Sequence, residues 1–404
     1  MQACLKFRDL EFEDFGDAVR IRFLRIFYFD IDRKDLEKIS EFRLKDDSIT
    51  FCTTQRKAEN KFNKILQQGF SRLSNIISKK PAVYVHQNSG IPLIGTNYFG
   101  LVDRDTNIIE LKPVTCCNMD CIYCSVAQDR READFVVEKD YLVNEFRKLV
   151  RHKNTTGIEA HIGGQGEPLM YADIIGLVRD LSAIEEVSTV SIDTNGTLLS
   201  EKLVGQLVDA GLTRINLSVN SFEPGLAREI AGFPYDTERI KKLADIIASR
   251  ISLIIAPVML KGINESEMPK IIQFAKTLRK KHNKSDVWVG IQNFLVYRHG
   301  KKPVRQIEWD SFFAALKRWE KEHDIVLTKM PFEFFETAKL RKPFRRGDTV
   351  NAELVSMGRF RHEMIAAAGG RAIAVPNCNK DKGKVLLKIQ RSKDNVFTGS
   401  LVGK

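Results

Sequence analysis

Two patterns of hydrophobic and polar positions alternate along the chain from about residue 107. Short runs rich in β-branched residues, such as 158–162, are each followed by a stretch with apolar residues at helical spacing, such as 172–182. Six such strand–helix units follow one another, and the last helix covers 309–322. Because strands joined by helical crossovers run parallel in one sheet, the pattern predicts an α/β core, either a partial (β/α)6 barrel of the TIM type or an open doubly wound sheet.

The two ends of the chain show different patterns. Residues 1–100 mix charged and aromatic positions with a helical stretch at 57–77, which indicates a small accessory α/β domain. Residues 341–404 carry short strand-like runs interrupted by glycines such as Gly358 and Gly383, a pattern typical of a small OB-like antiparallel β-barrel. We therefore expect three domains, at residues 1–100, 101–330 and 341–404.

Composition and charge narrow the class of protein. The 404 residues are 43% hydrophobic and 29% charged, which is typical of a soluble globular protein. No apolar run is long enough for a membrane span or a secretory signal, so we expect a cytoplasmic protein without a membrane partner. The net charge is +12, and residues 341–404, with 14 Lys plus Arg against 5 Asp plus Glu, contribute +9 of it. This concentration favours either a polyanionic partner or a solubilising surface.

Four of the seven cysteines lie between residues 116 and 124, which indicates a metal site in a reducing compartment. Cys117, Cys121 and Cys124 are separated by three and then two residues, and three such thiolates can bind three irons of a [4Fe–4S] cubane. A fourth thiolate at this spacing is absent from the loop, which leaves one iron open to a small molecule. The alternatives are Cys116 in place of Cys117, or a structural zinc or four-ligand site that recruits one of the distant cysteines, namely Cys4, Cys52 or Cys378.

The cysteine motif, placed after the first strand of a β/α repeat and with the aromatic Tyr123 before its third cysteine, resembles the radical SAM superfamily. The second strand ends in Gly163-Gly-Gln-Gly-Glu-Pro168, which is similar to the family's glycine-glycine-glutamate-proline motif with Gln165 inserted. The resemblance covers residues 107–330 and implies a [4Fe–4S] cluster at Cys117, Cys121 and Cys124 as the catalytic centre. It further implies reductive cleavage of S-adenosylmethionine (SAM) to a 5′-deoxyadenosyl radical, with electrons from a donor such as ferredoxin or flavodoxin.

The same resemblance implies cofactor contacts at the ends of successive strands. Polar side chains there offer donors and acceptors to the methionine moiety and the ribose, and backbone groups with Val258 flank the adenine. Each polar residue taken alone is as well explained as a turn or cap residue. The implied contact residues are Tyr123, Gly164, Gln165, Gly166, Glu167, Thr194, Asn195, Ser218, Asn220, Val258, Gln292 and Asn293.

The C-terminal segment resembles a TRAM domain, a small RNA-binding β-barrel attached to several RNA-modifying enzymes. Its cations are suited to phosphate contacts, and Phe344 and Phe360 could stack on bases, although barrel core is the more common role of such aromatics. The expected RNA-binding residues are Arg345, Arg346, Arg359, Arg361, Arg371, Lys384 and Lys388. The TRAM-bearing tRNA methylthiotransferases carry three further N-terminal cysteines, whereas this chain has Cys4 and Cys52 there. A methyl-carrying cysteine would have to be Cys116 or Cys378.

Three functional hypotheses follow. The first is a radical SAM enzyme that modifies RNA, with tRNA the expected kind. The second is a radical SAM enzyme that acts on a protein or a small molecule and uses the basic domain for docking. The third is a non-catalytic iron–sulfur protein that binds RNA or senses redox state, and it leaves the SAM-like strand ends without a role.

Overall fold

The centre of the molecule is a single open sheet with seven strands. In this computed structural model, which describes residues 1–329 and 332–403, the strand order is β17-β15-β14-β13-β12-β10-β9. All neighbours pair in parallel except β9, which is antiparallel to β10 at one edge. The strands are β9 (Gly100–Asp103), β10 (Ile108–Lys112), β12 (Ile158–Ile162), β13 (Val187–Thr194), β14 (Arg214–Leu217), β15 (Ser252–Ile255) and β17 (Val287–Val289).

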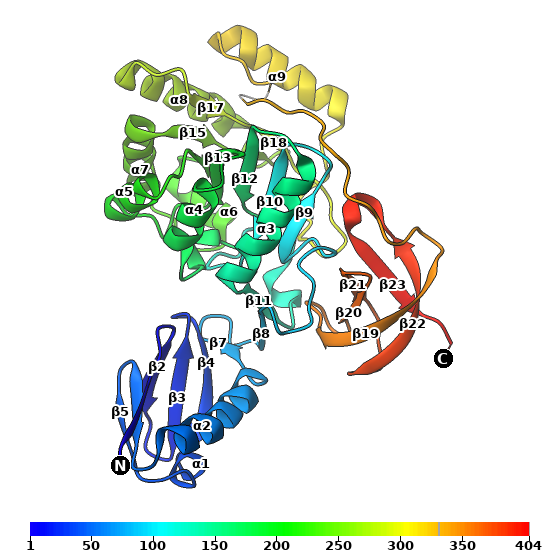
Figure 1. The fold of residues 1–404 in the computed structure, drawn as a ribbon. Helices are drawn as coiled ribbons and strands as arrows, with labels where there is room; N and C mark the ends of the chain where they lie inside the picture. Colours follow the sequence, from blue (N-terminus) through cyan, green and yellow to red (C-terminus); the bar gives the residue numbers. More distant parts are fainter. Residues whose placement is uncertain (330–331, 404) are drawn as a thin grey trace.

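The parallel strands follow one another in chain order without a reversal. A doubly wound sheet reverses its order at a switch point, so this alternative is wrong, and the winding is that of a sheet with right-handed crossovers in one direction. Figure 1 shows the crossover helices along the outside of the sheet. They are α3 (Lys139–Lys153), α4 (Ile174–Ser182), α5 (Glu201–Asp209), α6 (Pro224–Ala231), α7 (Thr237–Arg250) and α8 (Met268–His282). Helix α9 (Trp309–His323) follows the last strand of the sheet.

Local sequence explains where these helices begin and end. The Ser200 hydroxyl accepts a hydrogen bond from the amide of Leu203 at the start of α5, and Asp236 accepts one from Arg239 at the start of α7. Helix α3 ends at Asn154, which adopts the left-handed conformation that asparagine tolerates. Buried residues repeat along one face of each helix, for example Leu142, Phe146 and Leu149 in α3, and this face packs on the sheet.

The N-terminal part has two antiparallel sheets and a long helix. Helix α2 (Gln55–Phe70) is shorter than the expected 57–77, because Ser74 and Asn75 form β7 and pair with β4. Its Phe62 is fully buried against the aromatic core of this part, including Phe12 and Phe51. The other elements are β1 (Ala3–Lys6), β2 (Leu10–Asp14), β3 (Ala18–Phe23), β4 (Phe27–Asp32), α1 (Arg33–Glu37), β5 (Phe42–Lys45), β6 (Ser48–Phe51) and β7 (Ser74–Asn75).

The C-terminal part is a closed five-stranded β-barrel, as the glycine-broken pattern predicted. Its order is β19-β20-β21-β23-β22, and all pairs are antiparallel except β21 with β23, which is parallel. Its interior contains Ile373, Leu387 and Phe397, all fully buried. The strands are β19 (Thr349–Met357), β20 (Met364–Ala368), β21 (Arg371–Val375), β22 (Gly383–Arg391) and β23 (Phe397–Leu401).

The barrel lies beside the core (Figure 1), and main-chain hydrogen bonds join the two. The amide of Ala372 donates to the carbonyl of Ile94 at 2.9 Å, and the amide of Phe397 donates to that of Gly95 at 2.8 Å. Ala372 and Ile365 also belong to the hydrophobic core of the central sheet. Within the described residues, none of the helices is long and apolar enough to cross a lipid bilayer.

Candidate active site at the cysteine loop

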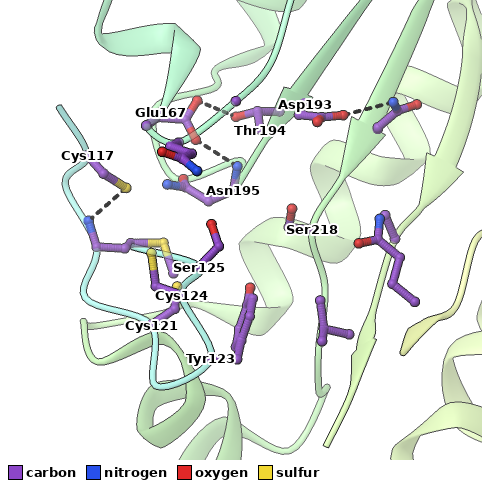
Figure 2. A pocket seen from close by; sticks show the side chains of 18 of the residues that line it. Cys117, Cys121, Tyr123, Cys124, Ser125, Glu167, Asp193, Thr194, Asn195 and Ser218 are labelled. Carbon is purple, nitrogen blue, oxygen red and sulfur yellow. Dashed lines mark hydrogen bonds between the residues drawn. The ribbon is translucent and has the colours of Figure 1, made fainter. Parts of the chain in front are cut away.

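One cavity of about 320 Å³ opens at the carboxyl ends of the parallel strands. Figure 2 shows the cysteine loop on one side of it and the ends of β13 and β14 on the other. Ligands collect at this edge of parallel sheets because the loops that follow the strands converge there. Eleven of the twelve implied SAM contacts line the cavity, and they are Tyr123, Gly164, Gln165, Gly166, Glu167, Thr194, Asn195, Ser218, Val258, Gln292 and Asn293.

Main-chain hydrogen bonds fix the cysteine loop, which leaves β10 and precedes β11 (Asp134–Val137). The amide of Ile122 donates to the carbonyl of Ile230 at 3.0 Å, and the amide of Lys301 donates to that of Cys124 at 3.0 Å. The ammonium of Lys301 also pairs with Asp120 at 2.6 Å. Cys117, Cys121 and Cys124 all line the cavity, and the sulfur of Cys117 accepts a hydrogen bond from the amide of Met119 at 3.4 Å.

The donor set fits an iron–sulfur cluster. Burial raises the pKa of the Cys117 and Cys121 thiols to about 12, so a bound cation is needed to hold them as thiolates at neutral pH. Across the described parts of the chain, no three Cys, His, Asp or Glu side chains converge closely enough for a single metal ion. A cubane places each thiolate on a different iron, so it does not need such convergence.

The other cysteines lie away from the cavity. Cys4 and Cys52 are exposed in the N-terminal part, and Cys378 is buried in the barrel core with its thiol donating to the carbonyl of Lys380. Cys116 is 1% exposed and belongs to the hydrophobic core, while its carbonyl accepts from the amide of Glu167 at 2.8 Å. The structure therefore disfavours a fourth protein thiolate, and also a methyl-carrying role for Cys116 or Cys378.

The glycines of the 163–168 turn are required by close contacts. A Cβ at Gly166 would lie 2.8 Å from the carbonyl oxygen of Cys116, and Gly164 has a φ of +124°. Glu167 has a structural role, because its carboxylate accepts hydrogen bonds from the Thr194 hydroxyl and the Asn195 amide, both at 2.8 Å (Figure 2). Burial raises the pKa of Glu167 to about 7. This carboxylate ties the turn to the end of β13 and has little capacity left for a ligand.

Asn220 and Asn293, two of the implied SAM contacts, differ in their position relative to the cavity. Asn220 is not among the residues that line the cavity: its amide donates to the Tyr123 hydroxyl and its carbonyl accepts from the amide of Val258, both at 2.8 Å. Asn220 therefore positions two lining residues and lines a small adjoining pocket, and its direct contact with a ligand stays a prediction. Asn293 donates to the carbonyl of Ile307 at 2.7 Å, but its own Oδ1 is buried without a partner in the described structure.

Sequence reasoning missed several lining residues. Asn216 precedes Ser218 by two positions and shares its face of the strand, so the alternation of strand side chains could have identified it. Asp193 accepts from the Asn216 amide at 2.9 Å and pairs with His161 at 3.2 Å. The remaining missed residues are Met119, Ser125, Gln128, Ala256, Phe294, Leu295 and Tyr297, and Ser125 directly follows the third cysteine.

The expected RNA-binding residues differ in burial: two are wholly or partly buried, and five are exposed. Arg371 is half-buried and donates to Asn395 and to the carbonyl of Arg341, so it is partly committed to the fold. Arg359 is fully buried, and its prediction as a phosphate contact is wrong. The exposed members are Arg345, Arg346, Arg361, Lys384 and Lys388.

Phe344 and Phe360 are half-buried, and each packs on another ring of the protein. Phe344 packs at 5.8 Å on Phe397 of the barrel core, and Phe360 stacks on His299 at 4.0 Å between ring centres. His299 lies on the loop that follows β18 (Gln292–Asn293), so Phe360 connects the barrel to the cavity entrance. Both rings thus have protein partners, which favours the core interpretation over base stacking.

Comparison with known proteins gives the family. The model of the radical SAM superfamily matches residues 111–275. An uncharacterized protein of Methanocaldococcus jannaschii is 35% identical over 362 residues, which are 82% of this chain and 83% of that protein. The GTP 3′,8-cyclase of Listeria monocytogenes serotype 4b is 32% identical over 180 residues, 43% of this chain and 51% of the cyclase. The chain thus spans about half the length of such cyclases.

Solved structures are more distant. A spore photoproduct lyase mutant with bound SAM and dinucleoside spore photoproduct is 13% identical, covers 61% of this chain and 81% of that chain, and has a TM-score of 0.43. The extended match to the archaeal protein and the family model over the cysteine loop and β10–α8 agree with the fold and the cavity. The chain belongs to the radical SAM superfamily, whose enzymes use a [4Fe–4S] cluster and S-adenosylmethionine.

Proposed function

We propose that this enzyme cleaves SAM reductively at a cluster held by Cys117, Cys121 and Cys124 and uses the resulting 5′-deoxyadenosyl radical to modify RNA, with tRNA the expected kind. One observation carries the first half of the proposal. Three half-buried thiols and the polar ends of the parallel strands line the same cavity, and no fourth cysteine of the described chain lines it. A ferredoxin or flavodoxin is the expected electron donor.

Different residues of the cavity bind different parts of SAM in this proposal. Thr194, Asn195 and Ser218 present polar groups on the side that faces the cysteine loop (Figure 2). Val258 and Asn293 also line the cavity, and we expect the adenine to lie against them. The cluster supplies the electron, while these residues orient SAM and the surrounding fold excludes water from the radical.

The surroundings of the cavity support a polyanionic substrate. Tyr297 lines the cavity, and the loop continues through the exposed cations Arg298, Lys302 and Arg305. The stacking of His299 on Phe360 brings this loop against the basic barrel. An RNA strand that contacts exposed barrel cations would therefore meet further cations at the cavity entrance, which favours RNA over a substrate that uses the barrel for docking alone.

A small nucleotide is the second candidate substrate. Matched relatives are named GTP 3′,8-cyclase, and the cations near the entrance also suit a triphosphate. The two candidates differ in how they use the barrel, since a nucleotide of this size would not need the exposed cations of β22, Lys384 and Lys388.

SAM cleavage is the first test. We expect anaerobically reconstituted, dithionite-reduced enzyme to release 5′-deoxyadenosine and methionine, measured by liquid chromatography and mass spectrometry. Cys121→Ala should lose at least a hundredfold of this activity together with cluster iron, and the exposed Cys52→Ala should retain both. Wild-type enzyme that binds four irons and releases no 5′-deoxyadenosine would contradict the proposal.

RNA binding is the second test. The double variant Arg345→Gln/Arg346→Gln should bind unmodified tRNA about tenfold more weakly in fluorescence anisotropy. Each lost phosphate contact should also lower the slope of log affinity against log salt by about 0.7 to 0.9. The matched control is Arg56→Gln/Lys57→Gln, an exposed cation pair on α2. Equal losses in both variants would indicate nonspecific binding.

A deletion strain tests the substrate directly, because its tRNA should lack one modified nucleoside in mass spectrometry. An unchanged nucleoside profile in tRNA from this strain would favour the nucleotide or another substrate.

A further inference from the structure

Arg359 connects the C-terminal barrel to the cavity. It lies between β19 and β20, is 0% exposed, and is the largest fully buried side chain of the described structure. Its two terminal nitrogens donate to the side-chain oxygen of Gln165 at 2.5 Å and to the main-chain oxygen of Gln165 at 2.7 Å. A barrel residue therefore binds both acceptors of the residue inserted in the glycine turn.

The electrostatic setting of Arg359 is unusual for a structural arginine. Among the described residues no carboxylate forms an ion pair with it, because the neighbouring Asp134 pairs with Arg131 at 2.8 Å. Burial lowers the pKa of Arg359 to about 10, so the side chain remains charged at neutral pH. Its Nε is buried without an acceptor, and the ring of Tyr98 lies 5.6 Å from the guanidinium carbon. A buried cation held mainly by neutral acceptors is costly for folding, which suggests a role other than stability.

Hydrogen bonds and a ring contact hold the turn that carries Arg359 in one conformation. The amides of Arg359 and Phe360 donate to the Glu363 carboxylate at 2.9 and 3.3 Å. The carbonyl of Arg359 accepts from the amide of Glu132 at 2.8 Å, and Phe360 stacks on His299. The guanidinium is thus presented to Gln165 by a preorganised loop, not by a flexible side chain that could pair elsewhere.

The position of Gln165 makes this contact relevant to the cofactor. Gly164, Gln165 and Gly166 all line the cavity. Two glycines flank Gln165 and leave the backbone of the turn with many accessible conformations, so an external clamp on its carbonyl selects one of them. While Arg359 holds that carbonyl, it also sets the orientation of the peptide groups on either side, which face the cavity.

We propose that Arg359 is a positioning residue for SAM, and that the docked barrel completes the SAM site by holding the 163–167 turn in its binding conformation. Weaker docking of the barrel then weakens SAM binding, which links cofactor affinity to the domain expected to bind the substrate. The inference rests on the proposed placement of SAM against this turn.

The test measures SAM affinity by isothermal titration calorimetry on the anaerobically reconstituted full-length protein. Arg359→Gln should weaken SAM binding at least tenfold while cluster iron and the electron paramagnetic resonance spectrum of the reduced cluster without SAM stay unchanged. The change in that spectrum on adding SAM should need correspondingly more SAM. Arg391→Gln, which removes an exposed arginine of the same barrel, should bind SAM as the wild type does.

A second variant keeps the test decisive if Arg359→Gln does not fold. Gln165→Ala removes one of the two acceptors on a half-buried residue, and it should weaken SAM binding in the same direction by a smaller factor. Where Arg359→Gln folds, the double variant should lose less than the sum of the two single losses, because both substitutions act through one contact. Folded variants that bind SAM as the wild type does would overturn the inference. Failure of the wild type itself to bind SAM would instead overturn the proposed function.

Discussion

Asp193 lines the cavity, and His161 beside it shows how a single residue depends on its charged neighbours. Alternate residues of β12, β13 and β14 face the same side of the sheet, and there Glu159, His161, Asp193 and Arg214 form one group of paired charges. His161 contacts the Ser191 hydroxyl at 2.8 Å and Asp193 at 3.2 Å. Burial disfavours the charged imidazole, but the negative charges of Asp193 and Glu159 outweigh burial and raise the pKa of His161.

The stability of the protein should therefore depend on pH through His161. A histidine whose pKa is higher in the folded than in the unfolded state stabilises the fold below its unfolded pKa, and this contribution is lost as pH rises through the folded value. We expect His161→Asn to lower the free energy of unfolding at pH 6 by more than at pH 9, measured by urea denaturation. A difference between variant and wild type that is the same at both pH values would contradict the raised pKa.

At the scale of elements, the alternation of strands and helices along the chain was predictable, but the residues at which each element begins and ends were less so. The six parallel strands were expected because each is a short apolar run before an amphipathic stretch, and such periodicity is a local property of the chain. The predicted end of α2 was wrong because Ser74 and Asn75 pair with β4, and this contact joins residues far apart in sequence. Short elements such as β11 and α6 carry too few residues for a periodic signal.

One ion pair holds two elements of the core and the segment that leads to the barrel. Lys153 at the end of α3 pairs with Asp103 of β9 at 2.6 Å, and both side chains are fully buried. The same ammonium donates to the carbonyl of Ala338 at 3.2 Å. Removing one member of a buried pair leaves an uncompensated charge, which is far more costly than losing an exposed pair.

We therefore expect Lys153→Met to lower the free energy of unfolding by about 3 to 5 kcal/mol, measured by urea denaturation of the full chain. The control is Lys148→Met on the same helix, which breaks an exposed pair with Glu145 and should cost less than about 1 kcal/mol. Similar losses of unfolding free energy in the two variants would contradict this expectation. They would show that water or protonation compensates the charge that is left on Asp103.

At the scale of the molecule, the barrel and the core form a continuous packed unit. Gly95 makes this possible: its φ is +140°, and a Cβ there would lie 2.0 Å from the carbonyl oxygen of Ala372. The backbone of the core approaches the barrel closely enough at this point for the hydrogen bonds of Ile94 and Gly95 to form. The domain boundaries expected from composition remain a prediction.

Gly95→Ala should loosen the barrel from the core because the new methyl group has no space. We expect faster hydrogen exchange at the amides of Ala372 and Phe397 and faster proteolysis between residues 332 and 348. Gly347→Ala is the matched control, since its φ is +99° but a Cβ there meets nothing within 4 Å. If exchange at the two amides rises equally in both variants, backbone strain alone explains the effect and the docking contact is not required.

The sequence by itself determined the family and the general architecture. Cysteine spacing, the glycine turn and strand–helix periodicity lie within short segments, so they are readable without the fold. Only the tertiary structure decided that Asn220 lies behind Tyr123, that the Glu167 carboxylate is bonded to β13, and that Arg359 is buried. Arg359 and Gln165 are 194 residues apart, and no local pattern distinguishes an exposed basic residue of the barrel from one that packs against the 163–168 turn. The physical reason is that burial depends on which surfaces meet, and that is settled only when the domains pack together.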